Sequence, residues 1–340
     1  MPAVSDNRRK WAEHNWEHGG HKWSPGGTEA GTEMLWARSI WPRLAPHLPA
    51  ATVLEIAPGF GRWTEYLLEH CERLIGVDLT PRCIEVCRER FAGPRTSFEV
   101  NDGESLPMVA DGSVDFAFSF DSLVHVEAPQ IASYLAELAR VLKPGAAAFL
   151  HHSNLNVYVG HGSNVPWWVP EPHWRARSVS ARTFRMAARA AGLACLSQEL
   201  INWIGRDAVV DRYHIPAARI PLTDCLSIVM RPLGDAPADT RMLCNRTFVD
   251  EWRQTLSLAP VYARRAREAS AVNPAPAEPR RRSEVLKERP YKELASQAFL
   301  HFDPIAPSLR ARRCPDCRTA LTATGGQTSC AHCQTQWSLL

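Results

Sequence analysis

The sequence predicts an α/β fold: a doubly wound sheet of seven strands with its last strand reversed, followed by a small cysteine-rich ribbon at the C-terminus. Between Thr52 and Pro232, apolar runs of strand length alternate with amphipathic segments of helix length, which is typical of a parallel sheet covered by helices. The last two of these runs follow one another with no helix between them. Four of the cysteines form two tight pairs near the end of the chain.

The apolar runs predict strands at 52–57, 73–78, 96–100, 114–120, 146–151, 193–203 and 224–231. The amphipathic segments predict helices at 62–70, 81–91, 128–141 and 180–191. Because only a loop joins the last two strands, we expect them to pair as an antiparallel hairpin at the edge of the sheet.

Differences in composition divide the chain into four regions. We expect a Trp/His-rich lid or cap over 1–50, a core over 51–232 with insertions at 155–177 and 204–223, a helical extension and Pro/Arg-rich linker over 233–311, and the ribbon over 312–340.

The overall composition is that of a globular protein, with 340 residues of which 45% are hydrophobic and 22% charged. The 39 basic and 36 acidic residues nearly balance, so nucleic acid is not the expected partner. No apolar run approaches the roughly 18 residues of a membrane span, and the first ten residues lack the apolar core of a signal peptide. With six cysteines scattered singly, we expect a cytoplasmic protein without a membrane partner.

A glycine-rich turn follows the first predicted strand. The segment from Val53 to Trp63 has the pattern of a buried strand, a turn containing Gly59 and Gly61, and the start of a helix. Glycines permit positive φ and let backbone N–H groups approach a ligand. The second strand ends at Asp78, where a carboxylate can accept ribose hydroxyls. The two features together predict a nucleoside site at the carboxyl ends of the strands.

The details of these motifs indicate a family. The turn reads Glu-x-Ala-x-Gly-x-Gly from Glu55, and Asn-Asp-Gly at 101–103 follows the third strand. On these motifs, residues 50–232 resemble the class I S-adenosylmethionine-dependent methyltransferases, whose Rossmann-like sheet has a reversed last strand. Ala57 stands where that family has its first motif glycine, so the turn must accommodate a methyl group.

The resemblance implies the residues that contact S-adenosylmethionine. Glu55, Ala57, Gly59 and Gly61 would lie along the methionine moiety, Asp78 would bind the ribose, and Asp102 with Gly103 would face the adenine. The neighbouring residues expected in the same site are Trp63, Leu79, Asn101 and Phe120. Asp102 has an alternative role as an Asx-turn residue before Gly103.

Candidates for a catalytic base follow the fourth and fifth strands. His125, His151 and His152 lie there with Asp121, and histidine titrates near neutrality. If the segment is helical, Asp121 and His125 share a face and could pair. His152 or His125 is the favoured base, with Asp121 as its orienting group or as a metal ligand. Neighbouring strand residues face opposite sides, so one of His151 and His152 must point into the core.

The expected acceptor is a small molecule that contains a sugar. Strings such as Leu-Glu-Ile-Ala-Pro-Gly-Phe-Gly-Arg-Trp (54–63) and His-His-Ser-Asn (151–154) look like a group of bacterial methyltransferases of glycan and secondary-metabolite pathways. The aromatic insertion at 155–177 suits the stacking of sugar rings. Some sugar methyltransferases use Mg²⁺, and Asp121 is available, but no carboxylate cluster is evident.

The cysteine pairs predict a zinc site. Cys314 and Cys317 are separated by twelve residues from Cys330 and Cys333, a spacing that supplies four thiolates to one structural Zn²⁺. Such a ribbon could serve as an oligomer contact or as a docking surface for a carrier protein.

The predicted function is therefore O-methylation of a sugar or another small polar metabolite, with a histidine base and S-adenosylhomocysteine as coproduct. Two alternatives stay open. One is an RNA, N- or carboxyl-methyltransferase, and the other is a non-catalytic nucleoside-binding adaptor that uses the zinc ribbon.

Overall fold

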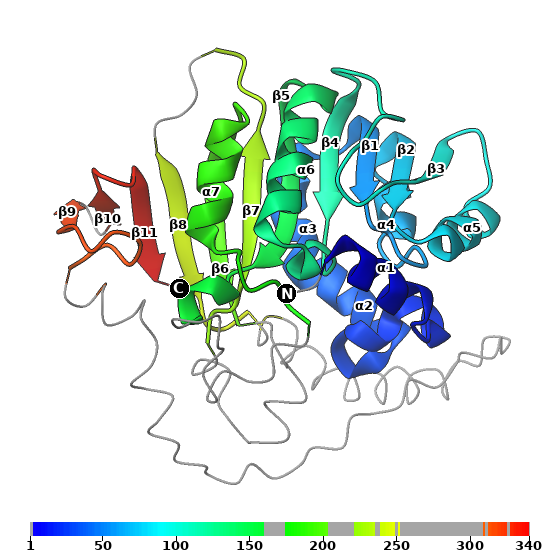
Figure 1. Cartoon of the computed structure of the whole chain (residues 1–340), viewed down its shortest axis with the longest axis horizontal. Helices are drawn as coiled ribbons and strands as arrows, with labels where there is room; N and C mark the ends of the chain where they lie inside the picture. The colour runs from blue at the N-terminus through cyan, green and yellow to red at the C-terminus, as the bar shows by residue number, and fades with distance from the viewer. Residues whose placement is uncertain are drawn as a thin grey trace, which may run out of the picture.

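The computed structural model describes residues 3–159, 174–202, 221–234, 239–248, 251, 309, 312–324 and 327–339. Within this part of the chain, a single sheet has the strand order β3-β2-β1-β4-β5-β7-β6-β8-β11-β10-β9 (Figure 1). Its strands are β1 (Ala50–Ile56), β2 (Cys71–Asp78), β3 (Thr96–Val100), β4 (Val114–Ser119), β5 (Leu142–Ser153), β6 (Ala194–Ile201), β7 (Asp224–Met230), β8 (Thr240–Asn245), β9 (Thr322–Thr324), β10 (Gln327–Cys330) and β11 (Thr335–Leu339).

The first seven strands confirm the predicted fold class. Strands β3, β2, β1, β4 and β5 pair in parallel. From β1, the strands β2 and β3 are added toward one edge of the sheet and β4 and β5 toward the other, as in a doubly wound sheet. Strand β7 is antiparallel to both of its neighbours, β5 and β6. Each of the seven predicted strands overlaps an observed one.

The antiparallel pair formed by β6 and β7 was expected at the edge of the sheet, but the sheet continues beyond it. Strand β8 pairs in parallel with β6, so neither β6 nor β7 is an edge strand. The prediction of a helical extension over 233–311 is wrong at Thr240–Asn245, which forms β8. The side chains of Thr240, Met242 and Cys244 are fully buried and alternate along the strand, and this period of two is that of a strand. Most of 233–311 lies outside the described residues.

Helices cover both faces of the sheet (Figure 1). The α-helices are α1 (Val4–Ala12), α2 (Glu29–Leu35), α3 (Trp41–Leu44), α4 (Thr64–Leu68), α5 (Pro81–Arg90), α6 (Ala128–Val141) and α7 (Ala181–Ala190). The short 3₁₀ or π segments are η1 (Glu17–Trp23), η2 (Pro25–Gly27), η3 (Trp36–Ile40), η4 (Ala45–His47), η5 (Leu123–His125) and η6 (Leu155–Tyr158). The predicted helices correspond to α4, α5, α6 and α7.

Two hydrophobic cores result, one on each face of the sheet. On one face, α6 and α7 pack against the strands through side chains such as Leu135, Leu138 and Phe184. On the other face, α2 to α5 pack against a layer that includes Phe116 and Phe118. No described helix is long and apolar enough to cross a membrane.

One part of the N-terminal region packs into the hydrophobic core, and another part covers the carboxyl ends of the strands. Trp36 and Trp41 stack on His70 beside α4, so η3 and α3 extend the core. By contrast, α1 and η1 lie over the carboxyl ends of the strands, with Trp11 and Trp16 facing the cavity described below. We call the segment from α1 to η1 (residues 4–23) the lid.

Candidate active site

A cavity of about 390 Å³ lies at the carboxyl ends of β1, β2 and β4. This volume is in the range of small-molecule sites, and the position is where doubly wound sheets bind ligands. Its floor is the turn after β1, its sides are the segments after β2, β3 and β4, and its roof is the lid. The predicted cofactor residues that line it are Ala57, Gly59, Trp63, Asp78, Leu79, Asn101, Gly103 and Phe120.

The turn after β1 has the left-handed backbone that its glycines predict. Ala57 has a φ of 60° and Gly59 one of 59°, so the methyl group of Ala57 is accommodated in a conformation that favours glycine. Gly61 does not line the cavity. A Cβ at Gly61 would lie 2.2 Å from the ring of Phe91, so this glycine is required for packing.

Two buried carboxylates stand under the cavity. Asp78 accepts hydrogen bonds from the N–H groups of Gly59 (3.1 Å) and Thr80 (2.8 Å), and burial raises the pKa of Asp78 to about 6. Burial likewise raises the pKa of Glu55 to about 8, although Thr64 donates a hydrogen bond to it (2.6 Å). Glu55 lies beneath the lining, and its Oε1 has no hydrogen-bond partner among the described residues. Burial therefore favours the protonated form of both carboxyl groups.

Of the two polar residues predicted to contact the cofactor after β3, one lines the cavity and the other does not. Asn101 lines the cavity and bonds the Tyr134 hydroxyl (2.8 Å), while its buried Oδ1 has no hydrogen-bond partner in the described structure. Asp102 is exposed and does not line the cavity. Its carboxylate accepts hydrogen bonds from the N–H groups of Glu104 (2.8 Å) and Ser105 (2.7 Å). The expectation that Asp102 faces the adenine is therefore wrong, and the Asx-turn alternative describes it.

Asp121 and His125 both line the cavity but do not pair. The segment is a 3₁₀ turn and not an α-helix, and Asp121 has a φ of 64°. The carboxylate of Asp121 forms an ion pair with Arg62 (3.0 Å). His125 bonds the Trp174 carbonyl oxygen through Nδ1 (3.1 Å), and its ring packs against that of Trp11.

The adjacent histidines of β5 point to opposite faces, as strand geometry requires. His151 is buried behind Phe120, accepts the Asp121 N–H at Nδ1 (3.1 Å), and contacts Asp224 through Nε2 (3.2 Å). His152 stacks on Phe184 on the other face, away from the cavity. Burial lowers the pKa of His152 to about 3. These contacts remove His152 as a candidate base.

Two buried ion pairs at the site were not predicted. Arg175 lines the cavity and makes two 2.8 Å bonds to the carboxylate of Asp224. Burial opposes ionisation of Asp224, but Arg175 and His151 nevertheless hold its pKa well below the usual range. Arg62 pairs with Asp121 across the cavity floor. Because these partners are 49 and 59 residues apart, no local spacing in the sequence signals them.

The predicted acceptor insertions are described only in part. Of 155–177, the structure describes η6 and the residues from Trp174 onward, and of 204–223 only the last three residues. The remainder of both insertions lies outside the described residues.

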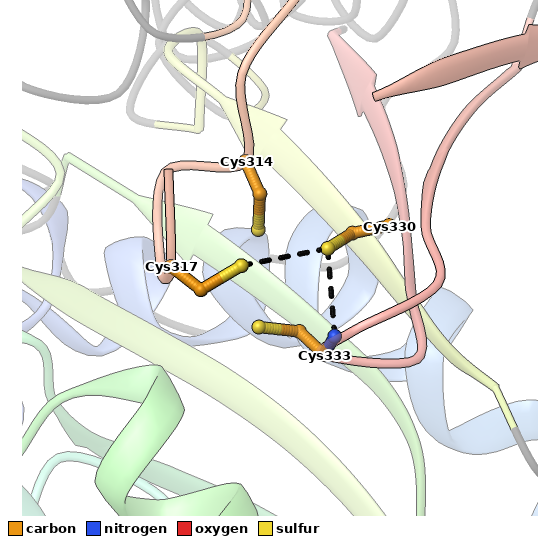
Figure 2. A group of neighbouring side chains, drawn as sticks. All are labelled: Cys314, Cys317, Cys330 and Cys333. Atoms are coloured by element: carbon orange, nitrogen blue, oxygen red, sulfur yellow. Dashed lines mark hydrogen bonds between the residues drawn. The ribbon is translucent and has the colours of Figure 1, made fainter. Parts of the chain in front are cut away.

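The four predicted zinc ligands are brought together (Figure 2). The Sγ atoms of Cys314, Cys317, Cys330 and Cys333 all lie within 4.8 Å of one another and point toward a common centre. Tetrahedral zinc with bonds of about 2.3 Å requires sulfur atoms roughly 3.8 Å apart. The separation between Cys317 and Cys330 is 3.6 Å, so the donor set fits this ion.

The ribbon that holds these cysteines is part of the sheet. Strand β11 pairs in parallel with β8, and Trp337, Cys314 and Cys330 share a hydrophobic core with Met242. Asp316, between the first two cysteines, forms a buried ion pair with Arg185 of α7 (2.5 Å).

Comparison with known proteins gives one family match and several partial relatives. Residues 53–145 match the family model described as "Methyltransferase domain". The phthiotriol/phenolphthiotriol dimycocerosates methyltransferase of Mycobacterium leprae is 33% identical over 180 residues, which are 50% of this chain and 58% of that protein. The biotin biosynthesis bifunctional protein BioHC of Cellvibrio japonicus is 29% identical over 169 residues, 47% of this chain and 32% of that protein.

Among solved structures, geranyl diphosphate methyltransferase in complex with GPP and sinefungin is 17% identical, with a TM-score of 0.46. The match covers 68% of this chain and 100% of that one. The chain spans less than two thirds of the length of the curated relatives named above. The family match over 53–145 and the strand order together support a Rossmann-like fold of the class I methyltransferase type.

Proposed function

We propose that this protein transfers a methyl group from S-adenosylmethionine to a small-molecule acceptor held under the lid. The observation that carries the proposal is one cavity that joins the left-handed turn after β1, the Asp78 carboxylate and the His125 imidazole. A cavity of this kind suits a nucleoside at one end and an acceptor at the other.

The turn and the segments beside it would hold the cofactor. Asp78 would accept the ribose hydroxyls, and the Oδ1 of Asn101 would accept a donor of the adenine. The indole Nε1 of Trp63 is buried with no described hydrogen-bond partner, so it can donate to the cofactor carboxylate.

His125 would be the base. When bound, the cofactor supplies a methyl group on sulfonium that needs little activation, so the enzyme must align the acceptor and accept its proton. Hydrogen bonding of Nδ1 to a carbonyl leaves Nε2 as the nitrogen that accepts the proton. His151 is the alternative. It is held between Asp121 and Asp224 behind the cavity lining, which suits an orienting role better.

The acceptor we favour is a hydroxyl of a sugar or another small polar metabolite. Trp11, Trp16 and Trp23 of the lid line the cavity and offer flat surfaces to a ring. Zinc would have a structural role, since four cysteine ligands close its coordination sphere.

The test is a titration calorimetry experiment with S-adenosylmethionine and S-adenosylhomocysteine, on protein whose zinc content is measured. We expect micromolar binding of both and one zinc per chain. Release of S-adenosylhomocysteine is then screened with nucleotide sugars, glycosylated metabolites and RNA, and compared with His125→Gln. Binding without turnover of any acceptor would favour the adaptor alternative, and turnover of RNA would favour that alternative substrate. Failure to bind either nucleoside would overturn the proposal.

A further inference from the structure

Three residues that are far apart in the sequence form a closed ring of hydrogen bonds at the edge of the cavity. They are Asn7 of the lid helix α1, His125 at the end of η5, and Trp174, which lies near the end of the 155–177 insertion. Asn7 is only 7% exposed and His125 only 6% exposed, whereas Trp174 is 38% exposed, so the ring has two buried members and one at the surface.

Each member of the ring donates one hydrogen bond and accepts one. The Nδ2 of Asn7 donates to the His125 carbonyl oxygen (2.9 Å). The indole Nε1 of Trp174 donates to Oδ1 of Asn7 (2.8 Å). The imidazole Nδ1 of His125 contacts the Trp174 carbonyl oxygen (3.1 Å), and since a carbonyl only accepts, Nδ1 carries the proton.

The ring explains an unusual backbone. Trp174 has a φ of 63°, a conformation that a tryptophan rarely adopts. In this conformation, its carbonyl oxygen meets the His125 ring while its indole reaches the lid. Lys10, one helical turn after Asn7, lies over the Trp174 indole at 4.5 Å. The lid helix therefore holds Trp174 by two contacts.

We propose that Asn7 and Trp174 are positioning residues, through which the closed lid fixes the tautomer and orientation of His125. Proton acceptance at Nε2 requires the proton to reside on Nδ1. The Trp174 carbonyl selects this tautomer, and Asn7 holds that carbonyl in place. The closed lid thus favours the tautomer of the imidazole that accepts a proton at Nε2. The inference rests on the proposed function, because it concerns the residue assigned there as the base.

The test reads the tautomer directly and needs no acceptor. Full-length, zinc-loaded protein with ¹⁵N-labelled histidine is studied by NMR, with the His125 signals assigned from His125→Gln. We expect the Nδ1-protonated tautomer to dominate in wild-type protein, and its ratio to the Nε2-protonated tautomer to fall by about fivefold, the value of one hydrogen bond, in Asn7→Ala and in Trp174→Phe. Because both variants break the bond between Trp174 Nε1 and Asn7 Oδ1, their effects should be less than additive in the double variant.

The control is Arg9→Ala on the exposed side of the same helix, where the arginine side chain is 69% exposed. It should leave the tautomer unchanged. Hydrogen exchange of residues 4–12 would also accelerate in Asn7→Ala and not in the control. An unchanged tautomer in Asn7→Ala, or an equal effect of Arg9→Ala, would overturn the inference. Full turnover by His125→Gln would instead refute His125 as the base, while the tautomer result would still report whether the ring exists.

Discussion

Replacing Gly59 with alanine tests the closed lid. A Cβ at this position would lie 2.9 Å from two ring carbons of Trp16, which is about 0.6 Å inside a normal carbon–carbon contact. The left-handed backbone at Gly59 costs any residue with a side chain about 1–2 kcal/mol of folding free energy. Displacing Trp16 would also disturb its stacking on Phe60, a contact worth about 1 kcal/mol. We therefore expect Gly59→Ala to lower the free energy of unfolding by about 2–3 kcal/mol.

A double-mutant cycle separates the two contributions. In a Trp16→Ala background the clash is absent, so Gly59→Ala should cost only the backbone part, and the coupling should be about 1 kcal/mol by urea unfolding. Gly192→Ala is the matched control, because Gly192 has a φ of 82° and nothing lies within 4 Å of an added Cβ. Calorimetry should show weaker S-adenosylhomocysteine binding in Gly59→Ala and none of this effect in Gly192→Ala. Equal costs of Gly59→Ala in both backgrounds would refute the placement of Trp16 over the turn.

Three further predictions concern buried charge and zinc. The pKa of Glu55 is raised from about 4.5 to about 8, so the folded state holds the extra proton, and the free energy of unfolding should fall as pH rises through this range. Thermal melts should show a smaller decline in Glu55→Gln. Asp224→Asn leaves the Arg175 guanidinium buried without its carboxylate and should cost about 3–5 kcal/mol by urea unfolding, whereas a loss below 1 kcal/mol would contradict the pairing. Chelation of zinc, or Cys333→Ser, should speed hydrogen exchange in 240–245, and unchanged exchange there would mean that β11 stays paired without the ion.

The elements that could be predicted are those marked by a short, local sequence pattern. The strands at β1, β2 and β4 are short apolar runs, the turn after β1 is marked by its glycines, and the cysteine spacing predicts the four thiols that the structure brings together. The left-handed φ of Ala57 agrees with the expectation that this turn tolerates a methyl group. These features depend only on residues within about one structural element.

The parts that could not be predicted depend on contacts between distant segments. Asp121 and His125 have helical spacing, but the ion pair with Arg62 and the ring with Trp174 hold them apart. The choice between His151 and His152 required the register of β5, since alternation shows only that one of them faces inward. Strand β8 was missed because its six residues gain their partners, β6 and the C-terminal ribbon, from distant parts of the sequence.

The pairing of β8 with β11 also bears on aggregation. Without β11, one side of β8 would present a row of unpaired N–H and C=O groups on a strand whose Met242 and Cys244 side chains are apolar. Such an edge readily recruits strands from other chains. In the folded protein, the sheet instead ends at β9, which is only three residues long and made of Thr322, Ala323 and Thr324. The four-cysteine ribbon thus replaces an apolar six-residue edge with a short polar one, and an edge of this kind offers less backbone to strands of other chains.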